Sequence, residues 1–189
     1  MKMKVRSLIT MSLVAGSLMM VSCGDEKKEK NEEVSHEEHE MNDHSKGMHA
    51  EETMEAETAK FSDEAVQQAF DEYLAVKDAL VRTDASASRK SAQNLQNTLK
   101  QTQPEVAEIA SKIVATEDVN KQRELFSELT AAMEPILKEA ISSGKIYKQF
   151  CPMAFEGKGD YWYSSSEEIR NPYFGDKMLK CGRVDETIM

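Results

Sequence analysis

The sequence predicts a mainly α-helical protein, in which an up-and-down four-helix bundle is followed by a small C-terminal module of strands and loops. From Phe61 to Gly144, apolar residues recur at three- and four-residue steps, the spacing of amphipathic helices. After Gly144, short aromatic-rich segments alternate with turns that contain glycine and proline. Short connections make successive helices antiparallel, which favours the up-and-down order.

The first two helices are predicted from their start signals and apolar faces. Ser62 is a plausible N-cap, because two acidic residues follow it at the positive end of a helix, and the apolar stripe then runs from Val66 to Val81. The second helix begins at Asp84. Its apolar face is rich in alanine, which favours close helix packing, and ends at Leu99.

The third and fourth helices complete the predicted bundle. Pro104 marks the start of the third, because proline is common at the first helical position. The fourth runs from about Asp118 to Gly144, a helix-ending glycine. No histidine follows His49, so the paired Glu-x-x-His pattern of di-iron bundles is absent and a carboxylate-bridged iron enzyme is excluded.

The C-terminal module is predicted to contain three short strands. The expected strands are 146–155, 160–163 and 180–188, with a two-glycine turn at 156–159, a helical turn at 166–169 and a proline turn at 171–175. This segment contains both cysteines that follow residue 23 and most of the aromatic residues. It is therefore the part of the folded chain where chemistry is expected.

The first 22 residues have the pattern of a secretory signal, with a basic start and an apolar run that is too short for a membrane span. The end of the run, Ser22-Cys23-Gly24, resembles a bacterial lipoprotein processing site, where the cysteine becomes the lipidated first residue. The resemblance implies a protein anchored in the bacterial cell envelope, periplasmic or surface-facing. The alternative is an ordinary signal in which Cys23 is incidental.

Residues 23–58 are predicted to be a disordered tether, because they are acidic and contain no aromatic residue, no leucine and no isoleucine. All the histidines of the chain lie in this segment, among methionines, a mixture that suits copper, zinc and nickel. The candidate auxiliary metal ligands are His36, His39, His44, His49, Met41 and Met48. The alternative is a polar spacer. The net charge of −10 argues against a nucleic-acid partner.

The motifs Cys151-Pro-Met153 and Met178-Leu-Lys-Cys181 bring together thiol and thioether groups, which are the ligands that Cu(I) and other soft ions prefer. Alternation along a strand puts Cys151 and Met153 on one face, and helical spacing puts Met178 and Cys181 on one side of a turn. A disulfide between Cys151 and Cys181 is an equally weighted alternative, because such bonds are common outside the cytoplasm.

The same motifs resemble an uncharacterised bacterial domain of lipoproteins and secreted proteins, which is also appended to periplasmic adaptor subunits of heavy-metal efflux pumps. The resemblance rests on Cys-Pro-Met at 151–153, Asn-Pro-Tyr-Phe-Gly-x-x-Met-x-x-Cys-Gly at 171–182 and the run 70–80. It implies copper or heavy-metal handling. Cys151, Met153, Met178 and Cys181 match the pattern as candidate ligands.

The expected function is therefore that of a non-enzymatic, lipid-anchored protein that binds copper, Cu(I) in preference to other soft metals, for buffering, transfer or efflux. Heavy-metal efflux components are the expected partners. No pair of nucleophile and base supports a hydrolase or a thiol oxidoreductase. The alternative is a non-enzymatic envelope interaction module whose C-terminal segment is held by a Cys151–Cys181 disulfide.

Overall fold

Four helices make up half of residues 58–189, the part of the chain that the computed structural model describes. They are α1 (Glu64–Val81), α2 (Ala85–Leu99), α3 (Pro104–Val114) and α4 (Val119–Ala140). Each of these helices contacts the next along the chain, and α1 also contacts α4. Within residues 58–189, no helix is long and apolar enough to cross a membrane.

Aspartates cap three of these helices, because a carboxylate oxygen accepts the backbone N–H groups that the first turn leaves free. Asp63 accepts from Ala65 at 2.7 Å in α1, and Asp84 and Asp118 do the same for α2 and α4. The prediction of Ser62 as the first N-cap is wrong by one residue. Its hydroxyl and its N–H instead donate to the carbonyl of Ala140.

The fourth helix ends at Ala140, four residues before the predicted end at Gly144. The following residues form β2 (Ile141–Ser143), which pairs antiparallel with β1 (Lys60–Phe61). Pairing with β1 gives the backbone N–H and C=O groups of these residues hydrogen-bond partners. A longer helix would have supplied those partners from within itself.

The C-terminal module is an antiparallel sheet in the order β4-β3-β5, formed by β3 (Ile146–Cys151), β4 (Asp160–Ser164) and β5 (Arg183–Ile188). The first strand stops at Cys151 rather than at Phe155. The chain instead turns through α5 (Ala154–Gly157), where Phe155 and Glu156 have positive φ. Bends replace the helical turn predicted at 166–169, and η1 (Gly175–Met178) is a 3₁₀ turn.

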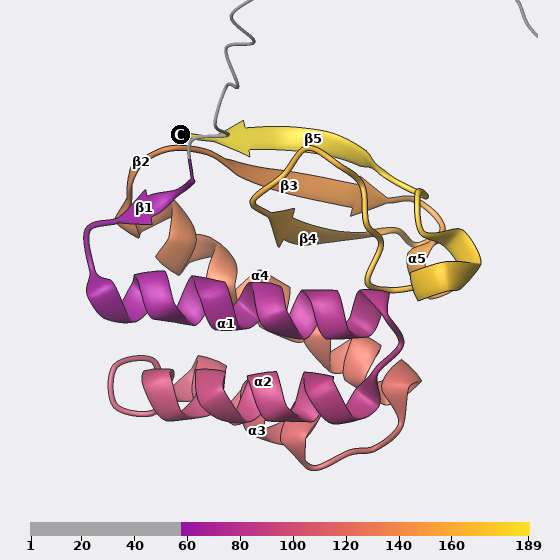
Figure 1. Ribbon diagram of the computed structural model, residues 1–189, viewed down its shortest axis with the longest axis horizontal. Helices are drawn as coiled ribbons and strands as arrows, with labels where there is room; N and C mark the ends of the chain where they lie inside the picture. The colour runs from indigo at the N-terminus through magenta and orange to yellow at the C-terminus, as the bar shows by residue number, and fades with distance from the viewer. Residues whose placement is uncertain (1–57) are drawn as a thin grey trace, which may run out of the picture. The chain divides into compact units, whose positions relative to one another are not determined.

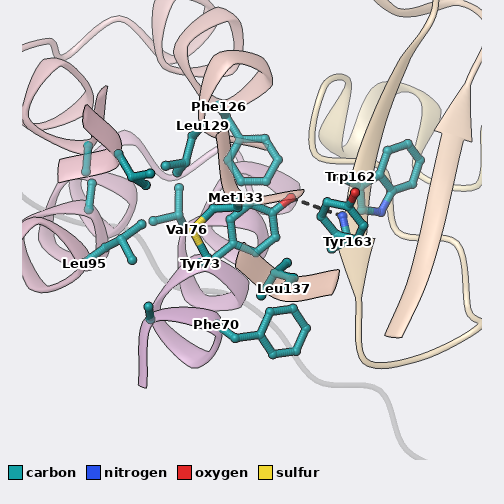
Figure 2. Close-up of a cluster of buried hydrophobic side chains, with 14 of the residues drawn as sticks. Phe70, Tyr73, Val76, Leu95, Phe126, Leu129, Met133, Leu137, Trp162 and Tyr163 are labelled. Carbon is teal, nitrogen blue, oxygen red and sulfur yellow. Dashed lines mark hydrogen bonds between the residues drawn. The ribbon is translucent and has the colours of Figure 1, made fainter. Parts of the chain in front are cut away.

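The sheet lies over α1 and α4, while α2 and α3 lie on the other side of that helix pair (Figure 1). Tyr73 of α1 lies where the two layers meet, and its ring stacks on Phe126 of α4. Its hydroxyl lies 2.8 Å from Thr130 Oγ1 and accepts the backbone N–H of Tyr163 in β4 at 3.1 Å (Figure 2). The mainly helical class with a small strand module is thus confirmed, whereas the up-and-down order stays a prediction.

Candidate functional site

Cys151 and Cys181, which are 30 positions apart in the sequence, have their Sγ atoms 3.2 Å apart. Cys151 is the last residue of β3, opposite Asp160 of β4, and is fully buried. Cys181 lies in the loop between η1 and β5 and is partly exposed. A disulfide bond is about 2.0 Å long. The two residues are therefore separate thiols in close contact.

Gly182 allows the loop to approach β3 this closely. Its φ is +148°, and a Cβ added there would lie 2.9 Å from the carbonyl oxygen of Phe150 and 2.9 Å from the ring of Trp162. No larger residue fits without moving the strand or the indole. The glycine thus brings the preceding cysteine beside the end of β3.

The buried side chain of Asn171 fixes the loop that carries Cys181. Its Nδ2 donates to the carbonyl oxygen of Cys181 at 2.7 Å, and its Oδ1 accepts the backbone N–H groups of Tyr173 and Phe174. The Asn171 N–H donates to the carbonyl of Leu179 at 2.9 Å. One asparagine therefore closes an asparagine turn and ties both ends of the loop together.

Arg123 of α4 joins this loop to the helices. Its Nε donates to the carbonyl oxygen of Pro172 at 2.9 Å, while its Nη2 donates to Thr83 Oγ1 at 3.1 Å and to the carbonyl of Leu80 at 3.3 Å. Arg123 as a whole is 7% exposed, so little of this side chain is open to water. The cysteine loop is consequently held against the C-terminal end of α1.

The contact between the sulfurs changes the ionisation of Cys181. The hydrogen bond with Cys151 raises the pKa of Cys181 above its ordinary value, and burial and the charge of a Cys151 thiolate raise it further. A hydrogen bond from the backbone of Met153 opposes these effects and lowers the pKa. Cys181 is thus a protonated thiol at neutral pH, with an amide close by that stabilises its thiolate.

The structure places the two methionines of the motifs differently from the prediction. Met153 lies after the end of β3, so the expectation that it shares a strand face with Cys151 is wrong, and 52% of its surface is exposed. Met178 ends η1, and its carbonyl oxygen accepts the N–H of Cys181 at 3.0 Å, so these two residues do share one turn. Both methionines stay candidate ligands.

The other predicted site residues lie outside residues 58–189. They are the lipidation candidate Cys23 and the auxiliary ligands His36, His39, His44, His49, Met41 and Met48. Within the described part of the chain, no group of three or more histidine, cysteine, aspartate or glutamate side chains is arranged to hold a metal ion.

A groove of about 640 Å³ next to the left-handed turn was not predicted from the sequence. It lies between α4 and the turn, and its acidic lining consists of Glu124, Glu128, Glu156 and Asp160. The first two lie on α4 and the last two lie on and just after the turn, and only the fold brings these two segments together. The positive φ values of Phe155 and Glu156 could not be predicted from the residue types either, since neither residue is glycine or asparagine.

A family model described as "Protein of unknown function (DUF3347)" matches residues 69–144. The match covers most of α1, all of α2, α3 and α4, and β2, and it ends before β3. The chain therefore contains a region similar to this uncharacterised family in its helical part, whereas the cysteine and methionine motifs lie beyond the match. No curated protein and no solved structure matches the chain.

Proposed function

We propose that the protein binds a soft metal ion, Cu(I) in preference to others, through the thiols of Cys151 and Cys181. The observation that carries this proposal is the 3.2 Å contact between the two sulfurs, one of which is partly exposed. Thiolates are the ligands that Cu(I) prefers. Two thiolates bound to Cu(I) have a net charge of −1, which is smaller than that of the two free thiolates, so the ion lowers the cost of placing both at the edge of a buried core.

Metal binding requires only a small change in the sulfur pair. Two sulfurs bound to one tetrahedral ion at about 2.3 Å each lie about 3.8 Å apart. The sulfurs must therefore separate slightly, and partly exposed Cys181 is the residue that has room to move. The exposed thioether of Met153 is available as a further ligand, and Met178 shares the turn of Cys181.

The cellular setting in the proposal comes from the N-terminal sequence. Lipidation of Cys23 anchors the protein in the bacterial cell envelope, and the histidines and methionines of residues 23–58 collect ions for the thiol pair. The role is buffering, transfer or efflux rather than catalysis, with heavy-metal efflux components as partners. The acidic charge speaks against nucleic acid.

A second candidate is a non-enzymatic envelope interaction module with a disulfide-stapled C-terminal segment. The same sulfur contact favours it, because the pair must approach by only about 1.2 Å to form a disulfide. The two candidates differ in what the reduced chain does. Only the first predicts tight Cu(I) binding by free thiols.

The test is the Cu(I) affinity of the reduced chain, measured by competition with a Cu(I) chelator. Cys151→Ala and Cys181→Ala should each remove tight binding, and Met153→Leu or Met178→Leu should weaken it. Met133→Leu, a substitution in the buried core of α4, is the matched control for loss of a thioether and should leave the affinity unchanged. Equal affinity in the double cysteine variant would refute the proposal.

The anchor has its own test. Cys23→Ser should move the protein from membranes to the soluble fraction, because Cys23 is the proposed lipid attachment point. Protein that still pelleted with membranes after a carbonate wash would contradict the lipoprotein assignment.

Deletion of residues 24–57 should lower Cu(II) capacity without changing Cu(I) binding by the thiol pair. Unchanged Cu(II) capacity would mean that the histidines are only part of a spacer.

A further inference from the structure

We infer that Cys151 and Cys181 form a reversible dithiol–disulfide pair in which Cys181 reacts first with an external disulfide, Cys151 resolves the intermediate, and the closed bond excludes the metal. The first two parts stand on geometry alone. The exclusion of the metal rests on the proposed function and adds regulation of the same site.

The order of reaction follows from the difference in exposure of the two sulfurs. Cys151 is fully buried at the end of a paired strand, so an external molecule cannot approach its sulfur. Cys181 is partly exposed in the loop before β5, so a molecule in solution can reach its sulfur. Only Cys181 is therefore accessible to a disulfide in solution.

The resolving step follows from the distance between the sulfurs. With its Sγ 3.2 Å from that of Cys181, Cys151 lies within reach of any disulfide formed there. The backbone on both sides is fixed, by pairing with Asp160 at one cysteine and by the Asn171 hydrogen bond at the other. Closure by about 1.2 Å needs only small side-chain and loop movements.

The reaction balances with a small-molecule disulfide such as oxidised glutathione. The Cys181 thiolate attacks one of its sulfurs, forms a mixed disulfide and releases the first glutathione thiolate. The Cys151 thiolate then attacks the Cys181 sulfur and releases the second. The two cysteines lose two electrons, oxidised glutathione gains them, and the cysteine protons pass to the released glutathione thiolates.

Closure removes both thiolate ligands at once. A bound ion leaves as Cu(I), without any change in its own oxidation state, because the electrons come from the sulfurs. Binding and oxidation are then reciprocal, since a ligand that binds only the dithiol stabilises it against oxidation. The pair would hold metal under reducing conditions and release it under oxidising ones.

The first experiment compares single-cysteine variants of the full chain, all carrying Cys23→Ser so that no third thiol interferes. With oxidised glutathione, the Cys151→Ala chain, which retains Cys181, should form the mixed disulfide at least about tenfold faster than the Cys181→Ala chain. Mass spectrometry follows the reaction. In guanidinium the two rates should become equal, because unfolding exposes both sulfurs. Equal rates in the folded proteins, or a faster reaction at Cys151, would overturn the order of attack.

The second experiment uses the chain with both cysteines and Cys23→Ser. Oxidised glutathione should yield an intramolecular disulfide and no lasting mixed disulfide. A mixed disulfide that persists would overturn the resolving role of Cys151.

The oxidised chain should bind Cu(I) at least about a hundredfold more weakly than the reduced one, and a phosphine reductant should restore binding. Equal affinity would overturn the exclusion of the metal. If the reduced chain bound no Cu(I), the proposed function would fail, while the thiol measurements would still decide the redox pair.

Discussion

Asn171 Nδ2 donates a 2.7 Å hydrogen bond to the carbonyl oxygen of Cys181, and this bond couples the loop geometry to the position of the cysteine. The same side chain accepts two backbone N–H groups of the loop through Oδ1. The donor function therefore holds the cysteine, while the acceptor function holds the turn. The two functions are separable by substitution.

Asn171→Asp should retain the acceptor and lose the donor at neutral pH. Disulfide closure with oxidised glutathione should slow in this variant, because the carbonyl of Cys181 is no longer held. Asn171→Ala removes both functions and should also lower the free energy of unfolding by about 2 kcal/mol, since buried backbone groups lose their partners. Exposed Asn94 of α2 is the control, and its replacement by alanine should change neither quantity. Unaltered closure in Asn171→Asp would contradict the positioning role.

Alanine substitutions at two glycines with positive φ distinguish the cost of backbone strain from the cost of steric contact. Gly157→Ala should cost about 1 kcal/mol of unfolding free energy, because its φ is +84° but no atom lies within 4 Å of the added Cβ. Gly182→Ala should cost more and should also slow disulfide closure, because its Cβ meets the Phe150 carbonyl and the Trp162 ring. Chemical denaturation and thiol mass analysis measure both effects. Similar costs at the two positions would mean that the loop shifts freely at Gly182.

Tyr73→Phe tests the link between the helices and the sheet. Loss of the hydroxyl leaves the N–H of Tyr163 and the Thr130 hydroxyl without their partner in the core, which should lower the free energy of unfolding by about 2 kcal/mol. Tyr161→Phe is the control, because that ring is only partly buried. Urea denaturation compares the variants. Equal loss at both tyrosines would show that the hydroxyl of Tyr73 adds nothing specific.

The helices were predictable because their signals are local. The apolar period, the proline at 104 and the aspartates at 84 and 118 each act within a turn, and the observed starts of α2, α3 and α4 agree with them. The end of α4 was not predictable in this way. It depends on pairing with β1, which lies about 80 positions earlier in the chain.

The two cysteines of the candidate site were predictable from the sequence, but the residues that hold their loop in place were not. Residue chemistry singled out Cys151 and Cys181, and the structure brings them together. Arg123, which holds the loop, could not be told from the other charged residues of its helix by sequence alone. The carbonyl groups that it binds come from distant segments of the chain. The strand predicted to include Met153 ends at Cys151, because residues 152–153 form a turn in which Met153 has a helical backbone conformation.

Glu134 of α4 should make stability depend on pH in the acid range. Its burial raises the carboxyl pKa, but hydrogen bonds from Lys148 of β3 and Lys138 of α4 outweigh this effect and lower the pKa from 4.5 to about 2. A depressed folded-state pKa contributes stability that is present above pH 4.5 and is lost as the pH falls toward 2. Because the side chain is about a third exposed, the contribution should be near 1 kcal/mol rather than the full value of the shift.

Urea denaturation of the wild type and Glu134→Gln at pH 7, 5, 3.5 and 2 tests this prediction. The variant should be less stable at neutral pH, and the difference should shrink between about pH 4.5 and pH 2, because the wild-type carboxylate becomes protonated and loses its attraction to the lysines. Glu128→Gln, at an exposed position of the same helix, should show a small difference that changes little with pH. A stability difference for Glu134→Gln that stayed constant down to pH 2 would mean that packing of the side chain, and not its charge, joins α4 to the sheet.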